Sequence, residues 1–216
     1  MIIKSIFFDF DNTIVDDYSF IIDCFRKTFF KLGIDISVSD ISYSIGKPQQ
    51  EIILGFLKKE EDLKDAMRIF NYYYSVNYKS EIKLFPGILE LLQDLSSKYR
   101  LALITGAPAN RVYIVSEHLH IKDFFSSIIT QDDVVLSKPN PEGILKTLKK
   151  LELNKNEIIY IGDANEDIDI SQNIDIKFIK ASWGDKRSFD NKKYYKYTEA
   201  QDPLSILDLI KNNKIL

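Results

Sequence analysis

The feature that most constrains the fold is the alternation of strand and helix patterns after residue 85. Short apolar, β-rich runs alternate there with segments whose apolar residues recur at helical spacing. The expected strands lie at 101–105, 127–130, 158–161 and 176–179, and the expected helices at 88–95, 109–119, 141–151, 166–172 and 204–210. This order predicts right-handed βαβ units and a mostly parallel sheet with helices on both faces.

The N-terminal part of the chain adds one strand and a helical insertion. The run 2–8 is short, continuous and apolar, which is typical of a strand buried on both faces. Apolar residues then keep helical spacing from Asp16 to Ile82, and Gly33 is placed to end the first helix. We therefore expect a Rossmann-like α/β core, formed by residues 1–15 and 83–216, with a helical cap at 16–82.

Composition excludes several classes of protein. The 216 residues are 45% hydrophobic, which is enough for a large core, and the net charge of −3 provides no general attraction to nucleic acid or anionic lipid. A single cysteine, Cys24, cannot form an intramolecular disulfide, and no apolar run approaches the ~18 residues of a membrane span. We expect a cytoplasmic protein without nucleic-acid or membrane partners; a monomer and a homodimer both stay open.

Polar side chains gather where the expected strands end. They are Asp9, Asp11 and Thr13 after the first strand, Thr105 and Gly106 after the second, Lys138 beyond the third, and Asp163 and Asp167 after the fourth. The carboxyl ends of parallel strands share one edge of a sheet, where ligands bind. Clustered carboxylates need a cation, and their hard oxygen atoms suit Mg²⁺. A lysine beside such a cluster favours a phosphoryl group as the substrate.

Four short motifs occur in order along these strand ends. They are the Asp9–Thr13 run DFDNT after an apolar strand, Thr105-Gly106, Lys138-Pro139, and Gly162-Asp163 with Asp167 four residues later. With these motifs the sequence resembles the haloacid dehalogenase superfamily over almost its whole length, and it is most similar to phosphoglycolate-phosphatase-like members.

The resemblance implies a role in catalysis for Asp9, Asp11, Thr105 and Lys138, and a role in substrate binding for Gly106. Asp9 would be the nucleophile, and Asp11 would protonate the leaving oxygen and then deprotonate water. Thr105, with Gly106, would bind a phosphoryl oxygen. Lys138 would offset charge on the nucleophile and the phosphate.

The resemblance also implies a magnesium site. Asp9 and Asp163 would ligate Mg²⁺ with their carboxylates, and Asp11 would do so with its main-chain carbonyl. Asp167 would support the site through water or a lysine, and the Thr13 hydroxyl would hold the loop together. Asn12 replaces the glycine of many relatives, but asparagine tolerates a positive φ.

The segment 16–82 matches the position and size of the small helical cap in this superfamily. Lys47 lies in a Gly-Lys-Pro turn that faces the active site in similar enzymes, so we expect it to contact substrate; an ordinary solvated turn is the alternative. Trp183-Gly184 is expected to pack beneath the catalytic loop, and 186–196 is expected to be a solvated loop.

The resulting hypothesis is a Mg²⁺-dependent phosphatase that acts on a small phosphorylated metabolite, such as a phosphoglycolate-like phosphomonoester, through an aspartyl phosphate. Pyrophosphatase, sugar-phosphate phosphatase, nucleotide phosphatase, phosphomutase and phosphonatase activities stay open. A catalytically silent relative that binds a partner is a further alternative, although Asp9 and Asp11 are both present.

Overall fold

The central feature of the computed structural model, which describes residues 2–45, 48–184 and 197–215, is a six-stranded parallel sheet. Its strands, in spatial order, are β5 (Phe125–Ile129), β4 (Arg100–Ile104), β1 (Ser5–Phe8), β6 (Ile158–Gly162), β7 (Lys177–Ala181) and β8 (Thr198–Ala200). The chain runs outward from β1 to β5 and then crosses to β6 on the other side of β1. This reversal of strand order at β1 is the place where open α/β sheets bind ligands.

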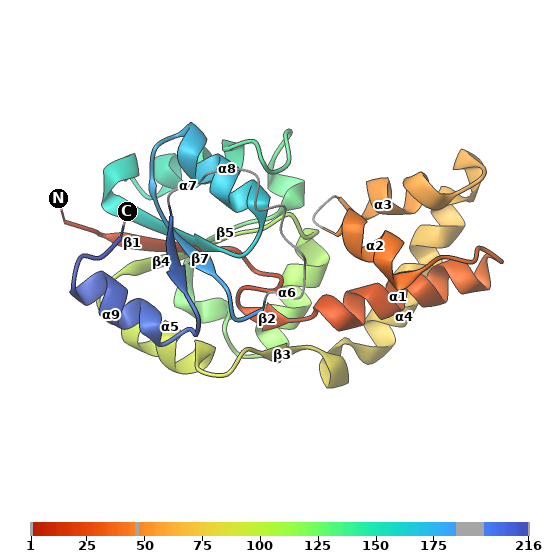
Figure 1. Cartoon of the computed structure of the whole chain (residues 1–216), viewed down its shortest axis with the longest axis horizontal. Helices are drawn as coiled ribbons and strands as arrows, with labels where there is room; N and C mark the ends of the chain where they lie inside the picture. The colour runs from red at the N-terminus through yellow and green to blue at the C-terminus, as the bar shows by residue number, and fades with distance from the viewer. Residues whose placement is uncertain (1, 46–47, 185–196, 216) are drawn as a thin grey trace. The chain divides into compact units, whose positions relative to one another are not determined.

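Helices cover both faces of this sheet. They are α5 (Ile88–Ser96), α6 (Ala109–His118), α7 (Glu142–Lys150), α8 (Asn165–Asn173) and α9 (Ser205–Lys211). Figure 1 shows α7 and α8 on one face and α5 and α9 on the other. Short 3₁₀ turns lie at Lys122–Phe124, Gln131–Asp133 and Lys155–Glu157. The predicted fold class, a parallel α/β core, is confirmed.

The sheet is stabilised mainly by burial of apolar side chains on both faces. All four residues of β1 are buried, and Phe7 packs in one cluster with Ala102 of β4 and Tyr160 of β6. Central strands of a parallel sheet read as continuous apolar runs because neither face meets water. That is why the short run at the N-terminus identified a central strand.

The segment Asp17–Lys83 forms a second compact unit, separate from the unit made of Met1–Asp16 and Leu84–Leu216. It consists of α1 (Tyr18–Lys31), α2 (Val38–Ser44), α3 (Gln49–Phe56) and α4 (Leu63–Glu81), with a 3₁₀ turn at Glu60–Asp62. Its boundaries fall one residue later than the expected 16–82.

Aromatic rings form much of the interior of this helical unit. Phe25 of α1 lies 4.7 Å from Phe70 of α4, measured between ring centroids, and Phe20 of α1 lies 5.3 Å from Tyr74 of α4. Helix α1 ends at Lys31, and Gly33 has a φ of +69°, which is the expected left-handed stop. Cys24 is buried, as expected of a small hydrophobic side chain.

Three strands of the structure were not predicted. Two-residue strands β2 (Val15–Asp16) and β3 (Lys83–Leu84) pair with each other, and β8 extends the main sheet beyond β7. Strands of two or three residues carry too few side chains to show a period-2 pattern. The loop expected at 186–196 and the turn residue Lys47 lie outside the described residues.

Candidate active site

The first part of the site is the loop that follows β1. The Asp9 amide donates to the Ile161 carbonyl at 2.8 Å, which ties the loop to the end of β6. Asp9 is 7% exposed. Asn12 has a φ of +58°, as its place in the expected tight turn requires. The chain thus turns sharply after β1 and leaves the Asp9 carboxyl group at the sheet edge.

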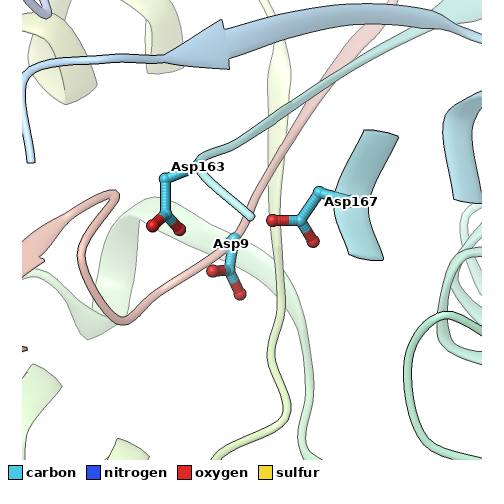
Figure 2. A group of neighbouring side chains, drawn as sticks. All are labelled: Asp9, Asp163 and Asp167. Carbon is cyan, nitrogen blue, oxygen red and sulfur yellow. The ribbon is translucent and has the colours of Figure 1, made fainter. Parts of the chain in front are cut away.

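Three carboxylates meet at this edge. Asp9 follows β1, Asp163 follows β6, and Asp167 lies in the first turn of α8 (Figure 2). One oxygen atom from each lies within 4.8 Å of the others, and all three residues are buried. A Cβ on Gly162 would lie 2.4 Å from Asp167 Oδ2, so only glycine leaves room for this approach. The arrangement can hold a metal ion, as the strand-end motifs predicted.

Lys138 bridges two of these acids. Its ammonium nitrogen donates to Asp9 Oδ1 at 2.7 Å and to Asp167 Oδ1 at 2.8 Å, and it lies 5.5 Å from the centre of the Tyr160 ring. The Tyr160 hydroxyl also donates to Asp167 Oδ1, at 2.6 Å. The Ala164 amide donates to Asp167 Oδ2 at 3.1 Å, so Asp167 is fixed by three donors and in turn fixes the position of Lys138.

The three buried carboxylates favour a bound proton or cation between them. Burial raises the pKa of Asp9 well above its ordinary value; Lys138 opposes the shift, and the Asp167 and Asp163 carboxylates add to it. Burial by itself would lower the pKa of Lys138, but Asp167 and Asp9 outweigh burial and raise that pKa well above its ordinary range. Burial is the main cause of the Asp9 shift, and the neighbouring carboxylates are the cause of the Lys138 shift. In both cases a proton or a metal ion would offset the buried negative charge.

The loop after β1 also holds Asp163. Asn12 Nδ2 donates to Asp163 Oδ2 at 2.6 Å, and Thr13 Oγ1 donates to Asp163 Oδ1 at 3.2 Å. The Trp183 indole nitrogen donates to the Thr13 carbonyl at 2.9 Å, and a Cβ on Gly184 would lie 2.4 Å from the Asn12 carbonyl oxygen. Trp183-Gly184 therefore packs against the loop that follows β1, as expected.

A pocket joins the second and third motifs. Thr105, Gly106, Ser137 and Lys138 contribute polar groups to its lining, and apolar residues such as Ile104 form much of the rest. The Thr105 hydroxyl accepts a hydrogen bond from the Ala107 amide at 3.0 Å, which fixes its rotamer. The structure thus brings Thr105 and Gly106 together with Lys138.

The Asp11 side chain is not part of the three-carboxylate group. Its Oδ2 accepts a hydrogen bond of 2.7 Å from Arg111 Nη2, and its side chain is 31% exposed. Arg111 was not among the predicted site residues, because it belongs to none of the four motifs. Arg111 is the third residue of α6, and the first turn of a helix that follows a strand lies at the same sheet edge. Inclusion of those first turns would have identified it.

Comparisons with known proteins agree with this geometry. The sequence model of the family described as haloacid dehalogenase-like hydrolase matches residues 6–181. The chain is 26% identical to the pyrophosphatase PpaX of Oceanobacillus iheyensis, over 97% of this chain and 98% of that protein. It is 28% identical to a phosphoglycolate phosphatase of Yersinia pestis, over 79% of this chain and 77% of that one.

A solved structure is also similar over nearly the full length. A haloacid dehalogenase-like family hydrolase from Streptococcus pneumoniae has a TM-score of 0.79 and 28% identity, and the match covers 95% of this chain and 97% of that one. The chain belongs to the haloacid dehalogenase-like hydrolase family, and the predicted enzyme class, a hydrolase, is confirmed. No helix within the described residues has the length and apolar character needed to cross a membrane.

Proposed function

We propose that this hydrolase is a Mg²⁺-dependent phosphatase that cleaves a small phosphomonoester and carries the phosphoryl group on Asp9. The observation that supports this most is the bond from Lys138 to Asp9 inside a buried group of three carboxylates. A buried carboxylate beside a fixed cation can attack an electrophilic phosphorus atom. The relatives named above, a pyrophosphatase and a phosphoglycolate phosphatase, also support phosphoryl chemistry.

The residues present fit Mg²⁺, which prefers oxygen ligands. We assign Asp9 and Asp163 as ligands through their carboxylates and Asp11 through its main-chain carbonyl, with Asp167 in support. The raised pKa of Asp9 supports the assignment, because burial and the nearby Asp167 and Asp163 carboxylates both disfavour its charged form and a cation would offset that cost. When bound, the ion would supply charge compensation for the phosphoryl oxygens.

In the first chemical step, an Asp9 carboxylate oxygen forms a bond to phosphorus and the bond from phosphorus to the leaving oxygen breaks. Asp11 donates its proton to that oxygen, so the leaving group departs as a neutral alcohol. Lys138 holds Asp9 in place, and Thr105 with Gly106 binds a phosphoryl oxygen. The products of this step are the free alcohol and the phosphorylated Asp9.

In the second step, Asp11, now ionised, takes a proton from a water molecule. The water oxygen attacks phosphorus, and the bond between phosphorus and Asp9 breaks. Inorganic phosphate leaves, and both carboxyl groups return to their starting states. Asp11 can act as the acid in the first step and as the base in the second because it regains its proton from the water. Thr13, through its bond to Asp163, keeps the loop that carries both acids in position.

We also propose that the helical unit Asp17–Lys83 acts as a cap that excludes water and large polymers. The substrate would then be a small cytoplasmic metabolite rather than a nucleic acid. A phosphoglycolate-like ester is the first candidate, and pyrophosphate is the second, because the compared relatives carry those two names. Contact between Lys47 and the substrate stays a prediction.

A screen of the purified protein against phosphorylated metabolites and pyrophosphate tests the proposal. We expect phosphate release that requires Mg²⁺ and stops when a chelator is added. Release that a chelator does not affect would contradict the metal assignment. A well-folded protein that releases phosphate from no compound of the panel would contradict the phosphatase assignment and favour a binding role.

A further inference from the structure

A second cation lies at the sheet edge, and the chemistry described so far does not use it. The Arg111 guanidinium donates to Asp11 Oδ2 at 2.7 Å, and the side chains of Arg111 and Asp11 are 12% and 31% exposed. Asp11 Oδ1 makes no hydrogen bond within the described part of the chain. Arg111 therefore holds one carboxyl oxygen of Asp11 and leaves the other for the transferred proton.

The backbone that carries Arg111 is fixed by the loop after β5. Asp132 Oδ2 accepts a hydrogen bond from the Ala109 amide at 2.7 Å, at the first residue of α6. The Gln131 amide donates to the Ala107 carbonyl at 3.0 Å. These two bonds join the first turn of α6 to the loop after β5. The backbone that carries the Arg111 side chain is therefore held in place.

The two basic side chains bond to different acids of the site. Lys138 bonds to Asp9 and Asp167, where the transferred phosphoryl group would lie. Arg111 bonds to Asp11, and the acid that protonates the leaving oxygen must touch the leaving group. Arg111 therefore lies next to the leaving group, with the Asp11 carboxyl group as their shared neighbour. Lys138 already bonds to the nucleophile.

A guanidinium suits an anionic partner at this position. It carries five N–H donors in one plane, so it can bond to Asp11 and to a second carboxylate or phosphate oxygen at once. Its low exposure reduces competition from water, which strengthens attraction to an anion. A neutral alcohol would gain much less from the same contact.

We propose that Arg111 determines substrate choice by binding a negatively charged leaving group, either a carboxylate next to the ester oxygen or the second phosphate of pyrophosphate. The proposal rests on the proposed phosphatase function and on the role of Asp11 within it. It places recognition of the leaving group on the α/β unit itself, independently of any residue of the helical unit.

The experiment compares phosphoglycolate with its amide, two substrates of equal size that differ in the charge of the leaving group. The ratio of kcat/KM for the acid to that for the amide is measured in the wild type, Arg111→Gln and Arg111→Lys. We expect Arg111→Gln to lower this ratio about 10- to 100-fold, as for loss of a charge-assisted hydrogen bond. Arg111→Lys keeps the charge without the planar fork, so it should recover part of the ratio.

A second measurement does not depend on turnover of either compound. Glycolate and its amide are compared as competitive inhibitors of the hydrolysis of an aryl phosphate. Glycolate should inhibit the wild type better than the amide does, and Arg111→Gln should lose that difference. The control variant is Lys122→Gln, which removes another ion-paired cation, bonded to Glu117 at the far end of α6. It should leave both ratios unchanged.

The outcomes separate this proposal from the proposed function. An equal loss on the acid and the amide in Arg111→Gln, with glycolate inhibition unchanged, would mean that Arg111 only positions Asp11, and the proposal would be wrong. A wild type that prefers the amide would also contradict it. A wild type that hydrolyses no phosphate compound at all would contradict the phosphatase function instead.

Discussion

The site contains two groups of acids and cations that differ in their contact with water. In the first group, Lys138 lies between Asp9 and Asp167, and the side chains of these two acids are 10% and 0% exposed. In the second, Arg111 pairs with Asp11, whose side chain is 31% exposed. We call them the buried group and the open pair. Both lie at the carboxyl edge of the same sheet.

This difference indicates why the two groups suit different tasks. Little water reaches the buried group, so burial raises the pKa of Asp9, and the unscreened Asp167 and Asp9 carboxylates raise the pKa of Lys138. Such a group is suited to a constant part of the substrate, the phosphoryl group with its cation. Water reaches Asp11 of the open pair, so a variable leaving group can reach it too, whereas Arg111 at 12% exposed is about as buried as Lys138 at 14%.

The largest expected effect comes from Asp9, the proposed nucleophile of the buried group. Asp9→Asn should lower kcat by several orders of magnitude, because an amide oxygen cannot form the acyl phosphate. Steady-state phosphate release measures the loss, and circular dichroism checks the fold. Asp94→Asn is the matched control, because Asp94, whose side chain is 42% exposed, also pairs with a lysine, Lys98. A nearly unchanged rate in Asp9→Asn would rule out Asp9 as the nucleophile.

The next effect distinguishes the open pair from the buried group. Asp11→Asn should lower kcat by ~10²–10⁴, the usual contribution of general acid–base catalysis. The loss should be smaller for aryl phosphates than for alkyl phosphates, since an aryl leaving group needs less protonation. Asp9→Asn should lack that dependence. An equal loss for both substrate types in Asp11→Asn would contradict the general-acid assignment.

A third prediction concerns the metal. Asp163→Ala removes a proposed anionic oxygen ligand, so the Kd for Mg²⁺ should rise by at least tenfold. Titration calorimetry on the protein without substrate measures this directly, independently of activity. Asp94→Ala, in an exposed acid, should leave the Kd unchanged. Tight Mg²⁺ binding by Asp163→Ala would remove Asp163 from the set of ligands.

The smallest expected effect lies beside the buried group, in the loop that carries Lys138. The Glu142 carboxylate accepts bonds from the Val135 and Leu136 amides at 3.0 and 2.9 Å, and it pairs with Lys146. The bonds from Lys146 and from these two amides lower the pKa of Glu142 to about 2.

A lowered folded-state pKa means that the stabilisation is present above the ordinary value of 4.5 and is lost as the pH falls toward 2. Glu142→Gln should therefore lower Tm slightly at pH 7, and the difference from wild type should shrink between pH 5 and pH 3. Thermal unfolding at several pH values measures it, with the exposed Glu90→Gln as the control. A difference that does not change with pH would mean that the Glu142 charge contributes nothing to the loop.

Much of the buried group was predictable from local pattern. The apolar strands that end at Asp9 and before Asp163 identified two neighbouring strand ends, and parallel strands bring such ends to one edge. The Lys138 and Asp167 positions followed from the motifs. The contacts among these residues agree with the expected juxtaposition, although their chemical roles stay predictions.

The sequence by itself determined the α/β order and the residues at the strand ends, because hydrophobic periodicity and turn chemistry are local properties of the chain. Only the tertiary structure decided that Arg111 bonds to Asp11 and that Asn12 bonds to Asp163. Residues 11 and 111 are a hundred positions apart, and no local pattern sets the direction of a side chain across that separation. Packing of α6 on its neighbours sets that direction, and the pairing of Arg111 with Asp11 follows from it.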